Sequence, residues 1–226
     1  MSSMENLIIW NQEEDTSSMI GVDGTEENSP TRDDCKFGNG IEVTGYTGTT
    51  QREIYAVSSS GTHVIDFFWK AHIINTSMES NFLVHLEPTA GQGTEGDIRF
   101  LYNGASDQWR LQIYRSGQQN IFYDTTASTF SADDILHIRF IVSTTAFDGS
   151  DKVSLYINGA RLSVDSGDET QGLSGSVGGD LCLGNLTYVD RGMRGIIDNT
   201  KYYDVANTDI SNDLNNEGYG GRRRRT

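Results

Sequence analysis

The sequence predicts an all-β protein built as a two-sheet antiparallel β-sandwich, and three observations carry this prediction. Segments in which apolar and polar residues alternate recur about every 8 to 14 residues between positions 52 and 204. Gly, Asn, Asp and Ser separate these segments, as turns between strands require. Glycine contributes 25 of the 226 residues and proline only 2, which fits neither a disordered chain nor long helices.

The segments with the period-2 pattern of strands are residues 52–57, 63–74, 81–87, 97–103, 108–115, 119–124, 135–145, 152–158, 181–186 and 193–204. Their spacing is typical of an antiparallel meander rather than of alternating strands and helices. Tight turns with positive φ are expected at Asn103-Gly104, at residues 148–151 and at Asn158-Gly159. One short helix is expected from Asp209 to Leu214, after the capping sequence at residues 207–209.

The alternation also predicts which faces of the strands are buried. Residues 109–115 and 136–140 alternate cleanly, so each strand should have one face in the core and the other in solvent. His137 and Arg139 are therefore expected to point outward. Residues 63–69 are apolar on both faces, which is typical of a strand near the middle of a sandwich.

Three motifs follow one another in the second half of the chain. They are KVSLYING at residues 152–159, LCLG at 181–184 and RGIIDNTKYYD at 194–204, and LHIRF at 136–140 precedes them. By order and spacing, these motifs resemble the strands of laminin G-like and pentraxin-like jelly rolls, of the concanavalin A-like lectin/glucanase superfamily. Leu136 stands where that family usually has Trp. The resemblance implies two curved sheets packed face to face, the concave one often forming a groove for a glycan or another ligand.

The length suits a single β domain. Residues 1–34 are expected to form an acidic N-terminal strand and loop of this domain, residues 35–217 the jelly roll, and residues 218–226 a Gly/Arg tail. The net charge is −15, with 17 basic and 32 acidic residues. Such a charge repels nucleic acid and anionic membranes, so neither is an expected partner. The N-terminus shows no secretory signal.

The motifs of catalysis are missing from the sequence. Hydrolases of the superfamily that the chain resembles carry carboxylates at i, i+2 and i+4 on one strand face, and no such run occurs here. The Q-x-H motif of the lyases of that fold is also missing. The histidines, His63, His72, His85 and His137, lie in strand patterns without a nucleophile elbow or a reactive-looking cysteine. The sequence therefore predicts a protein that is not an enzyme, and an atypical glycoside hydrolase or polysaccharide lyase is the last alternative.

Glycan binding is the chemistry that suits the groove best. Aromatic rings stack on the C–H faces of sugars while polar side chains bind the hydroxyls. The candidates on the strands are Tyr102, Trp109, Arg110, Gln112, Tyr114 and Tyr123. The alternative interpretation puts Trp109 and some of the tyrosines in the core, because alternation does not tell which face is concave.

Metal and thiol chemistry is limited. Asp148 and Asp151 in a glycine-containing loop could supply oxygen ligands to Ca²⁺, although a solvated hairpin tip is the more common use of such a loop. No other cofactor is expected. Cys35 and Cys182 are too few and too far apart for a disulfide scaffold or a zinc site. One long-range disulfide and two unpaired thiols both remain open.

The C-terminal tail carries four of the 17 basic residues, namely Arg222, Arg223, Arg224 and Arg225. On an acidic protein, these charges predict an acidic partner surface, on copies of this chain or on another assembly protein. We therefore expect a non-catalytic interaction module displayed on an assembly such as a virion, as a capsid decoration or fibre-type protein that also binds polysaccharide. The alternative is a secreted carbohydrate-binding or adhesion domain, which sequons at Asn75 and Asn185 support weakly.

Overall fold

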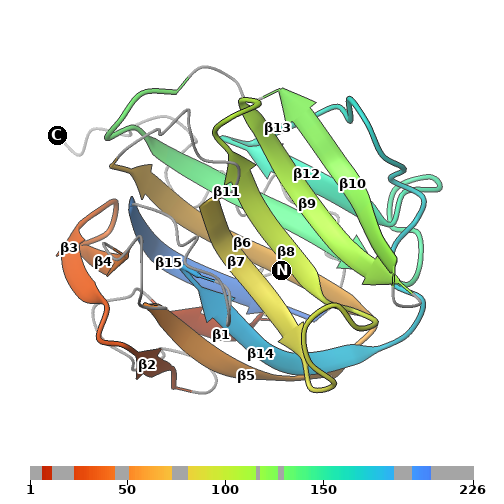
Figure 1. Cartoon of the computed structure of the whole chain (residues 1–226), viewed down its shortest axis with the longest axis horizontal. Helices are drawn as coiled ribbons and strands as arrows, with labels where there is room; N and C mark the ends of the chain where they lie inside the picture. The colour runs from red at the N-terminus through yellow and green to blue at the C-terminus, as the bar shows by residue number, and fades with distance from the viewer. Residues whose placement is uncertain are drawn as a thin grey trace, which may run out of the picture.

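The computed structural model describes residues 7–11, 23–43, 51–72, 81–115, 118–126, 130–185 and 195–204. Every regular element among them is a β-strand, and the strands form two antiparallel sheets (Figure 1). The predicted all-β, two-sheet sandwich is confirmed. The helix expected at 209–214 lies outside the described residues, among which no helix is long and apolar enough to cross a membrane. The division of the chain at residues 34 and 217 stays a prediction.

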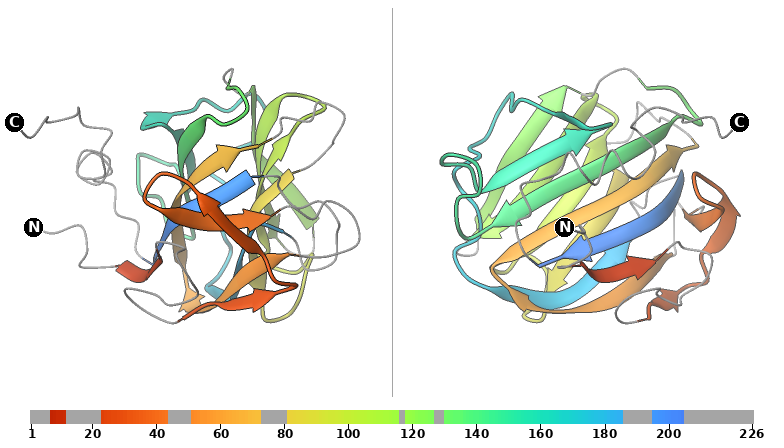
Figure 2. Two further views of the ribbon diagram at one scale, coloured as in Figure 1. Left: turned by 90° about the vertical axis from the view of Figure 1, so that its left-hand side faces the viewer. Right: turned by 180° about the vertical axis from the view of Figure 1, so that it is seen from behind.

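The larger sheet has eight strands. They are β1 (Leu7–Asn11), β3 (Thr31–Asp34), β4 (Asn39–Val43), β6 (Thr62–Ala71), β11 (Ile135–Ser143), β12 (Val153–Ile157), β13 (Ala160–Arg161) and β15 (Gly195–Tyr203). The strand order is β13-β12-β11-β6-β15-β4-β3, and β1 also pairs with β15. This sheet faces the viewer in the right-hand view of Figure 2, where the molecule is seen from behind relative to Figure 1. β6 lies near the middle, as the apolar residues on both of its faces predict.

The second sheet has seven strands and faces the viewer in Figure 1. They are β2 (Thr25–Glu27), β5 (Arg52–Ser60), β7 (Asn81–Pro88), β8 (Ile98–Asn103), β9 (Gln108–Arg115), β10 (Gln118–Thr126) and β14 (Val177–Leu183). The strand order is β10-β9-β8-β7-β14-β5-β2. The short strands β2, β3 and β13 were not predicted. They consist mainly of polar and charged residues, most of them exposed, so they lack the alternation of apolar and polar residues that identifies a strand.

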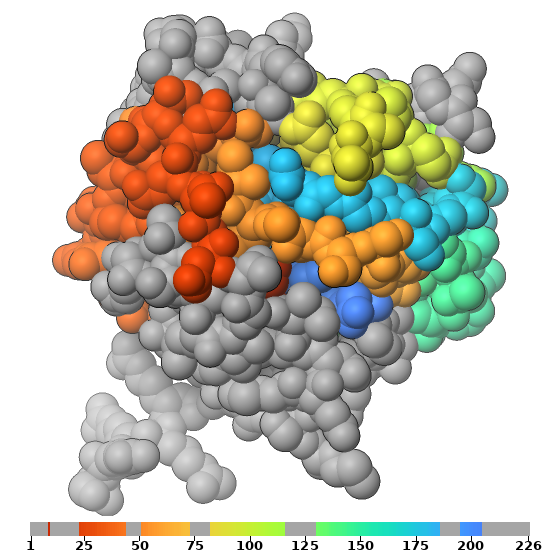
Figure 3. All heavy atoms as spheres, turned by 90° about the horizontal axis from the view of Figure 1, so that it is seen from below, coloured from red at the N-terminus to blue at the C-terminus, as the bar shows by residue number. Residues whose placement is uncertain are grey.

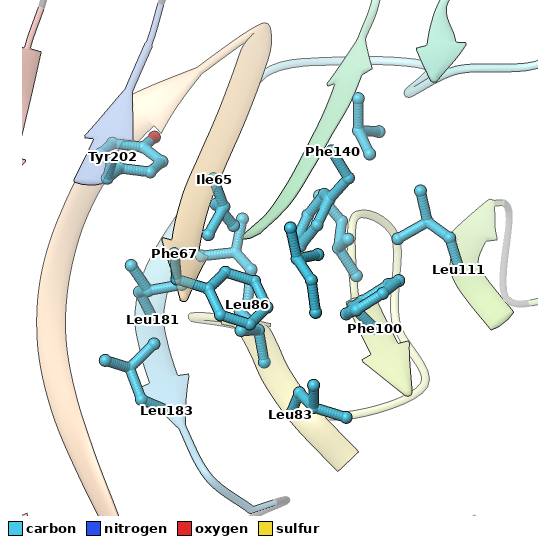
Figure 4. Packing of buried hydrophobic residues seen from close by; sticks show 14 of the residues in the cluster. Ile65, Phe67, Leu83, Leu86, Phe100, Leu111, Phe140, Leu181, Leu183 and Tyr202 are labelled. Carbon is cyan, nitrogen blue, oxygen red and sulfur yellow. The ribbon is translucent and has the colours of Figure 1, made fainter. Parts of the chain in front are cut away.

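The core lies between the two sheets and is rich in aromatic rings. Phe67 of β6, Phe100 of β8 and Phe140 of β11 meet there with no solvent exposure (Figure 4). The ring of Phe100 stacks on that of Phe140 at a centroid distance of 5.3 Å and on that of Trp109 at 5.6 Å. Truncating a buried ring of this kind to Ala typically costs about 3 to 5 kcal/mol, so these contacts hold the two sheets together.

Two of the predicted turns differ in outcome. Asn158 and Gly159 have φ values of 51° and 80°, so the tight turn between β12 and β13 is confirmed. At Asn103-Gly104, β8 and β9 are joined instead by the four residues 104–107, and positive φ falls on Asp107 at 52°. The side-chain oxygen of Asn103 accepts a hydrogen bond from the amide of Ala105 at 3.1 Å, which stabilises the longer loop in place of the tight turn.

The prediction that His137 and Arg139 point into solvent is wrong. Both lie on the outer face of the eight-stranded sheet, but they are 2% and 0% exposed. Asp66 of the neighbouring β6 lies 2.7 Å from His137 Nε2 and 3.7 Å from Arg139 Nη1. Burial alone would raise the pKa of Asp66, but the charges of His137, Arg139 and Lys201 and the hydrogen bond from His137 outweigh it, and this pKa is lowered. The alternation of apolar and polar residues predicted correctly that His137 and Arg139 lie on the outer face of the sheet. It did not reveal that Asp66 of the neighbouring strand pairs with both of them and allows them to be buried.

Candidate functional site

A surface cavity of about 650 Å³ lies at one end of the seven-stranded sheet, where β5, β7 and β14 run side by side. Its lining comprises Ala56, Val57, Ser59, Pro88, Thr89, Ala90, Glu95, Ser176, Val177, Gly178, Gly179 and Asp180. Figure 3 shows the surface where β14 lies beside β7 and its following loop. Ligand cavities commonly measure about 300 to 1,000 Å³, so the hollow is large enough for a small ligand.

Glycines allow the strands to approach closely beneath the cavity. A Cβ on Gly179 would lie 2.0 Å from the carbonyl oxygen of Glu87, and one on Gly178 would lie 2.6 Å from the amide nitrogen of Ser59. The pairing of β14 with β5 shifts register between Val177 and Gly179. Two residues of β5 oppose Gly178 of β14 at this bulge, and a bulge is a common way to shape the rim of a binding site.

Polar groups converge on this cavity from three segments. The amide nitrogen and hydroxyl of Thr89 both donate to the carbonyl oxygen of Gly178, at 3.1 and 3.2 Å, and hold the loop after β7 against β14. Glu95 accepts hydrogen bonds from the amide nitrogen and hydroxyl of Ser174. The carboxylate of Asp180 projects from the outer face of β14 and is exposed. Carboxylates and hydroxyls beside small apolar residues suit a ligand that carries many hydroxyl groups.

A row of polar side chains, all buried except the partly exposed Arg99, crosses the outer face of the same sheet beyond the cavity, and we call it the polar row. It comprises Arg52 of β5, Cys182 of β14, His85 of β7, Asp97, and Arg99 of β8. Cys182 lies opposite His85 in the β14–β7 register, and His85 lies opposite Arg99 in the β7–β8 register. Arg52 Nη1 lies 3.5 Å from Cys182 Sγ, and Asp97 Oδ1 lies 2.9 Å from His85 Nε2 and 3.0 Å from Arg99 Nε.

The row brings a thiol, an imidazole and a carboxylate into the order that thiol-dependent hydrolases use. However, Cys182 is fully buried, and burial raises the pKa of its thiol to about 12. A nucleophilic cysteine must be a thiolate that a substrate can reach, and Cys182 meets neither condition. Cys35 and Cys182 are both free thiols, so of the two alternatives the structure shows the unpaired one.

The residues predicted to bind glycans separate onto the two faces of the sheet. Trp109 and Tyr102 are 0% and 3% exposed and belong to the main core. The indole of Trp109 stacks on Phe130 at 5.5 Å, and the hydroxyl of Tyr102 donates to Asp107 at 2.7 Å. The structure therefore corrects the prediction that these two rings face outward, because apolar packing between the sheets takes both of them.

The other candidates lie toward the opposite side of the same sheet from the cavity. Arg110 and Tyr114 are partly exposed on the outer face of β9, whereas Gln112 is buried there. The guanidinium of Arg99 lies 4.7 Å from the centre of the Tyr114 ring. The backbone of Tyr123 pairs with Leu111, and its side chain lies outside the described part. Glycan binding by these residues stays a prediction.

The loop proposed for Ca²⁺ holds an arginine among its carboxylates. Arg161 reaches Asp148 Oδ2 at 2.9 Å, Asp151 Oδ2 at 2.5 Å and Glu169 Oε1 at 2.8 Å. The guanidinium lies where a cation would have to bind between these oxygens, and Ca²⁺ binding by Asp148 and Asp151 stays a prediction. The terminal arginines, 222–225, lie outside the described residues, and their role in assembly stays a prediction.

The cavity could not be predicted from the sequence because loops and a bulge form it. Its residues come from positions 56–59, 88–95 and 176–180, which no single motif connects. The signal that could have found them is the glycine content of residues 91–96 and 172–179, since several glycines close together often mark places where backbones approach one another.

No protein-family model and no curated protein sequence matches this chain. Solved structures match it over nearly its whole length. Domain 4 of AbnA, a GH43 extracellular arabinanase from Geobacillus stearothermophilus in complex with arabinotriose, is 17% identical with a TM-score of 0.63, covering 94% of this chain and 99% of that one. The binding domain of Paraclostridial Mosquitocidal Protein 1 is 13% identical with a TM-score of 0.66, covering 93% of this chain and 51% of that one.

A third structure belongs to botulinum neurotoxin type C, whose cell entry depends upon interaction with two ganglioside molecules. It is 9% identical with a TM-score of 0.63, and the match covers 95% of this chain and 52% of that one. The chain thus spans about half the length of the toxin domains. At sequence identities this low, the similarity to these solved structures shows the fold alone. The chain is therefore a two-sheet antiparallel β-sandwich with a cavity at one end of its smaller sheet.

Proposed function

We propose that this chain is a non-catalytic carbohydrate-binding module that holds part of a polysaccharide in the cavity between β5, β7 and β14. The observation that carries the proposal is the cavity itself, whose volume of about 650 Å³ and mixed lining of carboxylates, hydroxyls and small apolar groups match a sugar. The residues that bind would be Ser59, Thr89, Glu95 and Asp180, with Pro88 as the apolar contact.

The binding chemistry follows from these groups. Sugar hydroxyls would donate to the carboxylates of Glu95 and Asp180 and would accept a hydrogen bond from the hydroxyl of Ser59. The hydroxyl of Thr89, whose proton goes to Gly178, would accept a hydrogen bond from the sugar. The ring of Pro88 would contact C–H groups of the sugar. No aromatic side chain is among the described residues that line the cavity. Each hydrogen bond contributes about 0.5 to 1.5 kcal/mol net, so a single site binds weakly and repeated copies would strengthen the attachment.

The comparisons support the choice of ligand class. The AbnA domain was solved with arabinotriose, and the neurotoxin interacts with gangliosides. Both are glycans or carry glycans, and both proteins share the fold of this chain. We infer that this chain uses the same architecture for the same class of ligand. The resemblance of its strand motifs to laminin G-like jelly rolls supports a place in the concanavalin A-like superfamily.

The buried thiol of the polar row and the missing carboxylate run on the strands support a role without catalysis. We further propose that the module is displayed on an assembly such as a virion surface, held through the arginines of residues 218–226. Size-exclusion chromatography of the full chain and of a variant ending at residue 217 tests this step. The full chain should elute as the larger species, and identical elution would contradict the assembly role.

The glycan proposal is tested by filling the cavity. Ala56 lines it and is exposed on β5, so Ala56→Trp places an indole in the cavity without disturbing the core. Ala160 is exposed on β13 of the other sheet, and Ala160→Trp is the matched control. On a glycan array that includes arabinan fragments and ganglioside oligosaccharides, wild type and Ala160→Trp should bind the same glycans, while Ala56→Trp should lose them. Equal binding by all three proteins would place the glycan elsewhere, and no binding by the wild type would overturn the proposal.

A further inference from the structure

His85, Glu87 and Cys182 bring three metal-ligand atoms together on the outer face of the seven-stranded sheet. Cys182 of β14 lies directly opposite His85 of β7. Glu87 follows His85 by two residues, which puts both side chains on the same face of β7. A ring nitrogen of His85, a carboxylate oxygen of Glu87 and the sulfur of Cys182 all lie within 4.8 Å of one another. The strand register therefore assembles a sulfur, a nitrogen and an oxygen donor.

The imidazole of His85 is held in place with one nitrogen left over. The residue is fully buried, and Asp97 Oδ1 lies 2.9 Å from its Nε2. Its Nδ1 is buried and has no hydrogen-bond partner in the part of the chain that the structure describes. Buried polar nitrogens normally find a partner, so this one is available to a ligand. A carboxylate bound to the other ring nitrogen is the arrangement that orients metal-bound histidines.

The charges around Cys182 favour a divalent cation. Of the charges that act on this thiol, that of Arg52 has the largest single effect, and the carboxylates of Glu87, Asp180 and Glu27 oppose it. Asp180 lies opposite Glu87 in the β14–β7 register and adds a further negative charge beside the three ligands. Three carboxylates against one guanidinium leave an excess of negative charge, which a metal ion would neutralise.

We propose that His85, Glu87 and Cys182 bind a zinc ion, with water as the fourth ligand. A donor set of one thiolate, one imidazole and one carboxylate suits zinc better than calcium or magnesium, which take oxygen ligands. Cys182 would lose its proton to solvent and bind as the thiolate. This site adjoins the glycan cavity proposed above, because the cavity residue Asp180 lies opposite Glu87, but the zinc proposal does not depend on glycan binding.

Arg52 competes with the metal ion for this site. Its Nη1 lies 3.5 Å from the sulfur of Cys182 and 4.0 Å from a carboxylate oxygen of Glu87. Its Nη2 lies 2.5 Å from Glu27, so the guanidinium has a second acidic partner toward which it can withdraw when metal binds. The Arg52→Gln variant removes the competing charge and should bind zinc at least about tenfold more tightly than the wild type.

The test uses cobalt(II) as a spectroscopic substitute for zinc in the reduced, metal-free full chain. A cobalt ion bound by a thiolate gives a charge-transfer band in the near ultraviolet, which added zinc should abolish. The two free cysteines provide a matched pair of variants, because Cys35 lies away from the site. The Cys35→Ser protein should keep the band and the Cys182→Ser protein should lose it.

If Cys182→Ser fails to fold, variants at the other two ligands still test the proposal. His85→Gln can still donate to Asp97 and Glu87→Gln keeps the size of the side chain, so both should remain folded by circular dichroism and weaken zinc binding at least about tenfold, as loss of a ligand requires. The proposal is overturned if the wild type shows no band in a large excess of cobalt, if the band survives in Cys182→Ser, or if it disappears in Cys35→Ser.

Discussion

His63 should make the protein sensitive to mild acid. The imidazole is fully buried at the start of β6, and its Nδ1 lies 2.8 Å from the hydroxyl of Tyr202. Burial disfavours the charged ring and lowers the pKa of His63 from 6.5 to about 4. Folding therefore keeps this histidine neutral at a pH where the unfolded chain binds a proton.

The size of the effect follows from that shift. Because the folded-state pKa lies below the unfolded one, the stability contributed by the neutral ring is fully present above about pH 6.5 and is lost as the pH falls toward about 4. Lowering the pKa of His63 from 6.5 to about 4 corresponds to about 3 kcal/mol of unfolding free energy, of which about 2 kcal/mol is lost between about pH 7 and pH 4.5. Domains have only about 5 to 15 kcal/mol in total, so the loss should be easy to measure.

Urea unfolding at these two pH values provides the assay. In His63→Gln, which cannot titrate, the drop in unfolding free energy should be smaller than in the wild type by about 2 kcal/mol. The control variant is His72→Gln. His72 follows β6 and is partly exposed beside Glu42 and Asp133, so in this variant the acid-induced drop in unfolding free energy should be the same as in the wild type. If His63→Gln loses as much stability in acid as the wild type, the burial of His63 is not the cause and the reasoning is refuted.

Three further predictions concern other parts of the structure. Trp109→Ala should destabilise the fold by about 3 to 5 kcal/mol in urea unfolding, because the indole is fully buried between the sheets; a cost below about 1 kcal/mol would show that the ring is not a core residue. Asp66→Asn should cost about 3 to 5 kcal/mol, since it leaves Arg139 buried without its carboxylate, and unchanged stability would contradict the ion cluster. Melting of the wild type should not respond to added Ca²⁺, whereas Arg161→Ala should gain a response to Ca²⁺; a response of the wild type alone would show that Arg161 does not block the loop.

The strands could be predicted from the sequence because alternation is a local property. The predicted segments 108–115 and 52–57 match β9 and most of β5, and turn residues such as Asn158-Gly159 set the hairpin between β12 and β13. Burial was harder to predict. Periodicity correctly placed His137 on the outer face of its sheet. The carboxylate of Asp66, which stabilises the buried ring, lies 71 residues away in the sequence and could not be inferred from periodicity.

The candidate sites depend on register, which periodicity does not reveal. The cysteine count argued against a zinc site, yet the pairing of β7 with β14 places His85 and Glu87 beside Cys182. The cavity likewise arises where the bulge between β5 and β14 meets the loop after β7. Trp109 carried the pattern of a core residue and of a sugar platform equally well, and only the packing of Phe100 and Phe130 against it decides between them.

The most direct test of the central claim is an NMR titration of the labelled full chain with a glycan selected on the array. The account predicts that the largest amide shift changes fall on residues 88–95 and 176–180, which line the cavity, and that Ala56→Trp removes them. Shift changes centred instead on β11 and β12 of the other sheet, or none with any glycan, would contradict the claim that the cavity binds carbohydrate.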